Sequence, residues 1–255
     1  MKRLFKIKEG WYASNETLKS ERHSIINNAE IDSYMGTRDG QIIIANEKLL
    51  YASSEREGRA ELLVHTALCT HPEPKRVLVV GGDGSEVAEV VRHGIQPDWL
   101  PFDAIQIIET FFPERSTLID QARCIDAPAQ SYDVIIVAEL YGHCFDGLAN
   151  YLSERGLATI KATSSLHEPV AAREELARTA EPFWIAMPFL PATPWARAMG
   201  EFYIFCSRHY HPTADLLLQR ADFLEGVQVY TPELHVASFT LPRYLVTHFR
   251  GIAKN

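Results

Sequence analysis

The segment from Arg76 to His93 constrains the fold of this chain more than any other. An apolar run, Val77–Val80, is followed by a glycine-rich turn and then by apolar residues at helical spacing. This pattern predicts a buried parallel strand, a tight turn and a helix, which is where α/β proteins bind nucleotides. Gly81, Gly82 and Gly84 would let the backbone approach a ligand, and the start of the helix would supply unpaired N–H groups.

An acid inside this turn narrows the choice of ligand. Asp83 would repel a pyrophosphate, so the segment fits a simple dinucleotide-binding turn poorly. A carboxylate suits hydroxyl or cationic groups better, such as the ribose, amino or sulfonium groups of an S-adenosyl compound. The alternative is structural, with Asp83 capping the N-terminus of the following helix.

Composition excludes several classes of protein. The chain has 255 residues, 46% of them hydrophobic, which suffices for one large domain with a small annex. The net charge of −8 argues against non-specific nucleic-acid binding and is compatible with a cationic ligand. The four cysteines form no CxxC pair, so neither a zinc site nor a disulfide framework is indicated. No signal peptide and no apolar run of membrane-spanning length is evident, so we expect a cytoplasmic protein.

Two parts of unequal size are expected. From Arg22 to Ala52, short apolar segments alternate with turns, which predicts a small antiparallel β unit, and residues 55–70 predict a helix. The expected domains are therefore an N-terminal antiparallel β domain over residues 1–54 and a Rossmann-like, S-adenosyl-ligand-binding catalytic domain over residues 55–255. Beyond Lys75, strands and helices alternate, which implies an α/β fold with a doubly wound sheet. The later strands are expected at Ala104–Ile108, Val134–Ala138, Leu157–Ala162, Phe183–Met187 and Phe202–Ser207, with a helix over Pro169–Ala180.

Two further acids are expected at strand ends near the turn. Glu109 follows the predicted second strand about 25 residues after the turn, where α/β proteins often bind a ribose diol. Glu139 follows the strand Val134–Ala138. Three acids at one edge of a sheet repel one another unless a cation or hydrogen bonds relieve them, so a cationic ligand is favoured. The alternatives are a solvent-exposed cap for Glu109 and an ordinary loop position for Glu139.

Taken together, these segments resemble the spermidine synthase (polyamine aminopropyltransferase) family. The turn is similar to that family's VLIIGGGDGG...EVLRH, with one glycine missing. Residues 61–72 resemble its helix ending in His-Pro, residues 132–137 its YDVIIVD strand, and residues 230–244 its terminal YYTPEIHRAAFALPRYL. The resemblance spans about Ser24 to Tyr244, and Ala186–Phe189 is most similar to a divergent branch in Helicobacter-like bacteria.

The resemblance implies a methyltransferase-like Rossmann sheet with a small N-terminal antiparallel β domain. It also implies transfer of an aminopropyl group from decarboxylated S-adenosylmethionine to putrescine, giving spermidine and methylthioadenosine. Decarboxylated S-adenosylmethionine would be a co-substrate, with no prosthetic group and no metal. Asp83 would hold the ammonium of the donor, Glu109 the ribose hydroxyls, and Gly81, Gly82 and Gly84 would line the nucleoside. A homodimer is expected, as in the family and as the open edges of the β unit suggest.

Several family positions are changed. A Tyr-His pair that contacts polyamines falls at Arg59-Ala60, and the Asp-Ser-Ser-Asp stretch falls at residues 138–141, where neither aspartate is kept. The adenine-binding Asp-Ala falls at either Gln121-Ala122 or Asp126-Ala127. A substrate-site Trp is replaced by Phe202.

The attacking amine is protonated at neutral pH, so a group must accept its proton. Glu139 is the candidate for this amine-binding base, and Asp146 is the second choice. Tyr141 and Tyr230 would line the polyamine channel with aromatic faces, the alternative being that they pack in the core.

Two other functions are compatible with these residues. One is an S-adenosylmethionine-dependent methyltransferase on the same fold, which the changed positions permit. The other is a catalytically degenerate protein that binds a nucleoside or polyamine. The identity of the amine acceptor stays open, because apolar pockets discriminate methylenes only weakly, by ~1–3 kcal/mol each.

Overall fold

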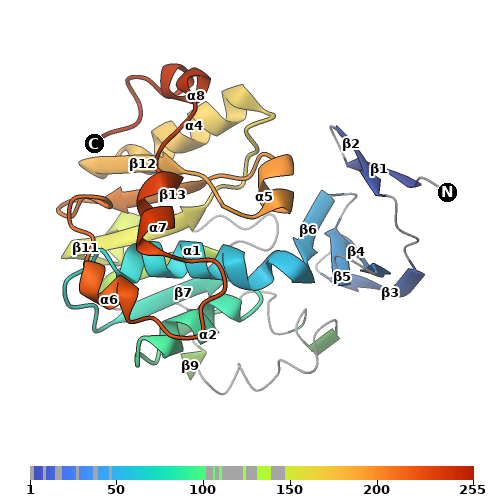
Figure 1. The fold of residues 1–255 in the computed structure, drawn as a ribbon, viewed down its shortest axis with the longest axis horizontal. Helices are drawn as coiled ribbons and strands as arrows, with labels where there is room; N and C mark the ends of the chain where they lie inside the picture. Colours follow the sequence, from blue (N-terminus) through green and yellow to red (C-terminus); the bar gives the residue numbers. More distant parts are fainter. Residues whose placement is uncertain are drawn as a thin grey trace.

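The computed structural model describes residues 3–7, 10–14, 19–26, 29–36, 40–45, 48–101, 106, 109–110, 123–124, 131–138 and 147–255. Within these ranges a seven-stranded sheet forms the centre of the molecule, with strand order β12-β13-β11-β10-β7-β8-β9 (Figure 1). Its strands are β7 (Val77–Gly81), β8 (Asp98–Leu100), β9 (Arg123–Cys124), β10 (Tyr132–Ala138), β11 (Leu152–Lys161), β12 (Ile185–Phe189) and β13 (Tyr203–Ser207).

The sheet is mixed. From β9 to β11 the neighbouring strands run parallel, so their carboxyl ends meet at one edge. The exception is β13, which runs antiparallel to both β11 and β12. The start of β13 therefore lies at the same edge as the ends of β7, β10 and β11, and this edge is where ligands of such sheets bind.

Helices cover both faces of the sheet (Figure 1). The helical segments are η1 (Ser53–Glu55), α1 (Arg56–Leu68), α2 (Ser85–Arg92), η3 (Leu148–Asn150), α4 (Pro169–Ala180), α5 (Pro194–Ala198), α6 (Leu218–Asp222), α7 (Pro232–Ser238) and α8 (Arg243–His248). Alternate residues of β7 point to opposite faces, since Val77 and Val79 belong to one buried cluster with α1 and α2, and Leu78 and Val80 to another with α4 and α8. The prediction of a doubly wound α/β sheet is confirmed.

Strands of the N-terminal segment lie outside this sheet (Figure 1). A hairpin pairs β1 (Arg3–Ile7) with β2 (Gly10–Ser14), and a four-stranded antiparallel sheet follows. Its strands are β3 (Lys19–Ile26), β4 (Ala29–Gly36), β5 (Gly40–Ala45) and β6 (Lys48–Ala52). The sequence predicted the antiparallel arrangement but not β1, β2 or β4, which are short or mix apolar and polar residues without a clear alternation.

Hydrogen bonds through η1 connect the two parts. The backbone N–H of Gln41 donates to Ser53 Oγ at 2.9 Å. The buried Glu55 carboxylate accepts the N–H groups of Trp195 and Ala196 at the start of α5. An ionised carboxylate at a helix N-terminus satisfies unpaired donors, so η1 and α5 are held together.

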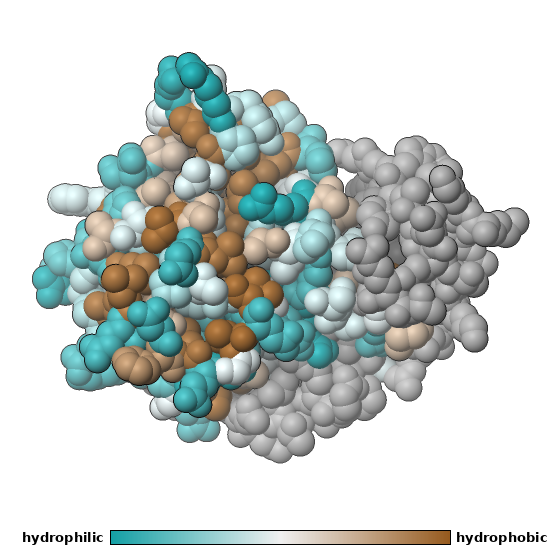
Figure 2. All heavy atoms as spheres, in the orientation of Figure 1, coloured by the Kyte–Doolittle hydropathy of each residue, from teal (hydrophilic) through white to brown (hydrophobic). Residues whose placement is uncertain are grey.

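The outer face around α6 and α7 retains exposed apolar side chains (Figure 2). Leu218, Phe223 and Val236 are among them. Exposed apolar residues are usual on folded proteins, so we assign no role to this surface.

Candidate active site

The glycine-rich turn lies between β7 and α2, as the sequence predicted. Gly81, Gly82 and Gly84 have φ angles of 69°, 82° and 87°, a region that side chains other than glycine rarely adopt. A Cβ on Gly82 would lie 2.4 Å from Glu86 Oε2 and 3.3 Å from the Cβ of Ala138. A side chain at Gly82 would therefore displace the Glu86 carboxylate and crowd Ala138 at the end of β10.

Asp83 is buried within this turn. Its Oδ1 accepts a hydrogen bond of 3.0 Å from the backbone N–H of Ser85, the first residue of α2. The alternative that Asp83 is the N-cap of α2 is wrong, because the N-cap residue is Gly84 and Asp83 instead pairs with the N–H of Ser85 from one position earlier. The role of Asp83 toward a ligand stays a prediction.

The strand beside β7 is not the one that the sequence predicted. β8 spans Asp98–Leu100, and Trp99, buried within it, donates from Nε1 to the carbonyl oxygen of Gly81 at 2.8 Å. Of the predicted strand Ala104–Ile108, only Gln106 is described, and it is helical. The prediction was wrong because the isoleucines of that segment recur at spacings that fit a helix as well as a strand.

Glu109 therefore does not lie at the tip of the second strand. It is helical and exposed, nine positions after β8 ends at Leu100. The prediction that Glu109 binds a ribose assumed a position at the tip of a strand, and the structure does not give Glu109 that position. Asp103 is the first acid after β8 and lies outside the described residues. It was missed because the sequence did not predict β8.

Three other predicted site residues, Gln121, Glu139 and Tyr141, lie outside the described residues, as do Asp126 and Asp146. Their places along the chain follow from their neighbours. β10 ends at Ala138, which pairs with Gly81, so Glu139 directly follows the strand beside the turn. Gln121 precedes β9 by two positions.

Tyr230 and Phe202 are core residues. The hydroxyl of Tyr230 lies 2.8 Å from His235 Nδ1, and only 2% of Tyr230 is exposed. Phe202 is fully buried on the other face of the sheet, with its ring centroid 5.9 Å from that of Phe249. The predicted substrate-lining role is therefore wrong for both, because each ring fills a buried cluster and the alternative of packing holds.

A charged cluster that the sequence did not predict lies at the carboxyl edge of the sheet. Arg59 of α1 donates from Nε to Glu201 Oε2 at 3.2 Å and makes a second bond to Oε1. Lys161 Nζ, at the end of β11, lies 4.0 Å from the same Oε1. We call these three residues the Arg59–Glu201–Lys161 cluster. It lies beside Tyr203, whose pKa burial raises to about 12 despite the nearby Arg59 guanidinium.

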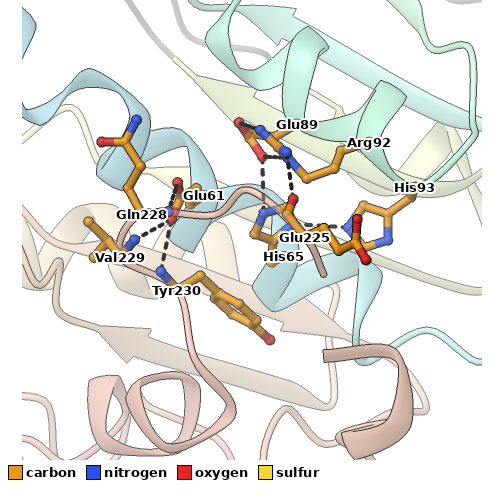
Figure 3. A network of polar contacts seen from close by, with 9 residues as sticks. All are labelled: Glu61, His65, Glu89, Arg92, His93, Glu225, Gln228, Val229 and Tyr230. Carbon is orange, nitrogen blue, oxygen red and sulfur yellow. Dashed lines mark hydrogen bonds and ion pairs between the residues drawn. The ribbon is translucent and has the colours of Figure 1, made fainter. Parts of the chain in front are cut away.

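A second polar network joins α1, α2 and the segment before α7 (Figure 3). The buried Glu61 carboxylate accepts the backbone N–H groups of Gln228, Val229 and Tyr230 at 2.7, 2.7 and 2.8 Å. One turn later, His65 Nδ1 lies 2.9 Å from His93 Nε2. This network holds α1 against the end of α2 and against the segment before α7.

Glu89 links the histidine pair to Arg92 (Figure 3). Its Oε2 lies 3.1 Å from His65 Nε2 and accepts from Arg92 Nε at 2.7 Å. Burial alone would raise the pKa of Glu89, but the contacts with His65 and Arg92 outweigh it and hold that pKa below its usual range. The Glu89 carboxylate therefore holds His65 and Arg92 in place between α1 and α2.

Within the described ranges, no group of three or more His, Cys, Asp or Glu side chains is placed to hold a metal ion. No helix among the residues with known placement is long and apolar enough to cross a membrane.

Comparisons with known proteins agree on one family. Residues 57–216 match the family model described as the spermine/spermidine synthase domain. The polyamine aminopropyltransferase of Helicobacter acinonychis (strain Sheeba) is 30% identical over 216 residues, covering 81% of each chain. That of Helicobacter pylori (strain G27) is 29% identical over 226 residues, covering 85% of each chain.

Solved structures give the same fold. The crystal structure of spermidine synthase from Thermotoga maritima matches with a TM-score of 0.85 at 18% identity, covering 97% of this chain and 93% of that one. A spermidine synthase solved in complex with the transition-state analogue AdoDATO matches with a TM-score of 0.84 at 19% identity, with the same coverage. The glycine turn, the sheet order and the family match agree, and the chain belongs to the spermine/spermidine synthase family.

Proposed function

We propose that this protein transfers the aminopropyl group of decarboxylated S-adenosylmethionine to putrescine, giving spermidine and methylthioadenosine. The observation that carries the proposal is the position of Asp83. It is a buried acid in a left-handed glycine turn, at the carboxyl end of β7, in a chain of this family. Gly81, Gly82 and Gly84 carry no side chains, so the turn has the bare backbone that suits close approach by a nucleoside.

The reaction needs a neutral amine. The nitrogen lone pair attacks the methylene carbon bonded to the sulfonium; the N–C bond forms as the C–S bond breaks, and the bonding pair stays on sulfur as a neutral thioether. The amine nitrogen loses one proton in the reaction, and because its pKa is near that of lysine, about 10.4, a nearby base must accept that proton. The sulfonium is already an activated leaving group, so orientation of amine, carbon and sulfur supplies much of the remaining catalysis.

Residue roles follow from position. Asp83 holds the ammonium of the donor, while Gly81, Gly82 and Gly84 line the nucleoside. Glu139, which directly follows β10 beside the turn, accepts the proton of the attacking amine, with Asp146 as the second choice. The remaining assignments are Tyr141 beside the acceptor, Gln121 beside the adenine and, in place of Glu109, Asp103 at the ribose.

The organisation of the protein is part of the same proposal. The four-stranded sheet ends at Ala52 and η1 begins at Ser53, which supports an N-terminal domain over 1–54 and a catalytic domain over 55–255. Cys69 and Cys206 are buried free thiols, as is usual for proteins of a reducing compartment such as the cytoplasm. The edge strands of the four-stranded sheet, β3 and β6, support a homodimer.

The test is an assay of the full chain with decarboxylated S-adenosylmethionine and putrescine, measuring methylthioadenosine and spermidine together. We expect equal amounts of both, with the rate falling by at least about a hundredfold in Asp83→Asn, which keeps an oxygen for Ser85 but loses the charge. The exposed Asp222→Asn is the matched control.

Two outcomes would overturn the proposal. Formation of S-adenosylhomocysteine from S-adenosylmethionine, without products from the decarboxylated donor, would identify a methyltransferase. Binding of methylthioadenosine without turnover of any diamine would identify a nucleoside-binding protein.

A further inference from the structure

The Arg59–Glu201–Lys161 cluster occupies a defined place relative to the turn. Lys161 is the last residue of β11 and pairs in register with Tyr203, so Glu201, two residues before β13 begins, lies at the carboxyl edge of the sheet. β11 separates β13 from β10, whose end adjoins Gly81. Neighbouring strands lie about 4.8 Å apart, so the two spacings from β10 to β13 place Glu201 about 10 Å along this edge from the end of β10.

The Glu201 carboxylate has bonding capacity to spare. A carboxylate offers about four acceptor positions, and Arg59 fills two of them. Lys161 is its only other cationic partner in the part of the chain that the structure describes, and at 4.0 Å its ammonium is too far from Oε1 for a hydrogen bond. The side chain of Glu201 is 12% exposed, so a ligand at the sheet edge can still reach it.

The chemistry of the acceptor calls for a second carboxylate. In a diamine, only the attacking nitrogen must be neutral, while the distal nitrogen keeps its proton and its charge. An ammonium that leaves water needs a charged hydrogen-bond partner. The turn and the end of β10 lie at one end of this stretch of the sheet edge, and Glu201 lies at the other.

We propose that Glu201 binds the distal ammonium of the acceptor diamine and thereby sets the acceptor's length. Arg59 is a positioning residue that fixes the carboxylate through two bonds. The Lys161 ammonium lies near Glu201 Oε1 and competes for it. The distal ammonium of the bound diamine takes the place of this weak contact. This inference rests on the proposed aminopropyl transfer.

The test compares putrescine with cadaverine, which is one methylene longer. In Glu201→Gln we expect the KM for putrescine to rise about tenfold or more, with kcat and the KM for the donor within about threefold. In Glu201→Asp the carboxylate retreats by one methylene, so kcat/KM for cadaverine relative to putrescine should rise about tenfold. A purely structural role for the ion pair would not move this ratio.

A second variant covers the case in which Glu201 variants do not fold. Lys161→Met removes the competing ammonium and keeps the Arg59 bonds, so the KM for putrescine should fall by about threefold or more. The exposed Glu154→Gln on the same strand as Lys161 is the control for the loss of a charge.

The outcomes separate this inference from the proposed function. Wild-type protein that releases no methylthioadenosine with either diamine would sink the proposed function. Active wild-type protein, with unchanged putrescine KM and unchanged diamine preference in the folded variants, would overturn the role of Glu201 alone.

Discussion

Glu61 accepts a hydrogen bond of 2.8 Å from the backbone N–H of Tyr230, a residue 169 positions later in the chain. The same carboxylate also accepts the N–H groups of Gln228 and Val229. A single buried acid on α1 therefore satisfies three consecutive backbone donors of the segment that leads into α7. Buried backbone donors are costly to leave unpaired, so the loss of this carboxylate would leave three of them without their acceptor. The acid is therefore a structural element of the α1 face.

We predict that Glu61→Gln lowers the free energy of unfolding by about 2–3 kcal/mol, because the amide offers one oxygen to three donors and loses the charge that strengthens each bond. Urea denaturation of the full chain measures this loss. The exposed Glu233→Gln on α7 is the control and should change stability by less than about 0.5 kcal/mol. Equal stability of the two variants would contradict the structural role of Glu61.

Gly82→Ala should impair the nucleoside site. The substitution places a side chain at a φ of 82°, at a cost of about 1–2 kcal/mol, and its Cβ displaces Glu86 at the turn. We expect a lower melting temperature and loss of most of the thermal stabilisation that saturating methylthioadenosine gives the wild-type protein.

Gly94→Ala is the matched control for this substitution. Gly94 has a φ of 73°, and a Cβ there meets nothing within 4 Å. The variant should therefore carry a similar backbone strain while keeping the full ligand-induced shift. A full shift in Gly82→Ala as well would show that the turn does not contact the nucleoside.

Much of the fold could be predicted because apolar runs are local signals. The residues of β7, β10 and α4 lie where their apolar patterns placed them, and α4 has the predicted bounds, Pro169–Ala180. β8 was missed because a three-residue strand is shorter than the window in which periodicity is measurable, and its stability comes from burial of Trp99.

The site could be predicted only where its residues are close in sequence. Asp83 and the glycines lie within one turn, so their spacing carries the information. Arg59 and Glu201 are 142 positions apart, and no local pattern pairs them. The prediction that Tyr230 lines the substrate channel failed for a related reason. An aromatic side chain in a terminal segment suits a channel and a core equally until its packing is known.

Acid should destabilise the protein through its buried histidines. Burial, with His65 and Arg220 nearby, lowers the pKa of His93 to about 3, although Glu89 opposes the shift, and burial lowers the pKa of His235 to about 4. In the unfolded chain both titrate near 6.5, so between about pH 6.5 and 4 the unfolded state binds protons that the folded state does not. The free energy of unfolding should therefore fall as the pH falls through this window.

His93→Gln tests the contribution of one histidine. Each such group adds up to about 1.4 kcal/mol per pH unit to the slope of stability against pH, so the variant should show a slope shallower by about that amount. Urea denaturation at several pH values between about 4 and 6.5 measures the slope. The exposed His209→Gln is the control for the loss of an imidazole. An unchanged slope in His93→Gln would mean that His93 takes up a proton within the folded protein, and that the contact with His65 yields at mildly acidic pH.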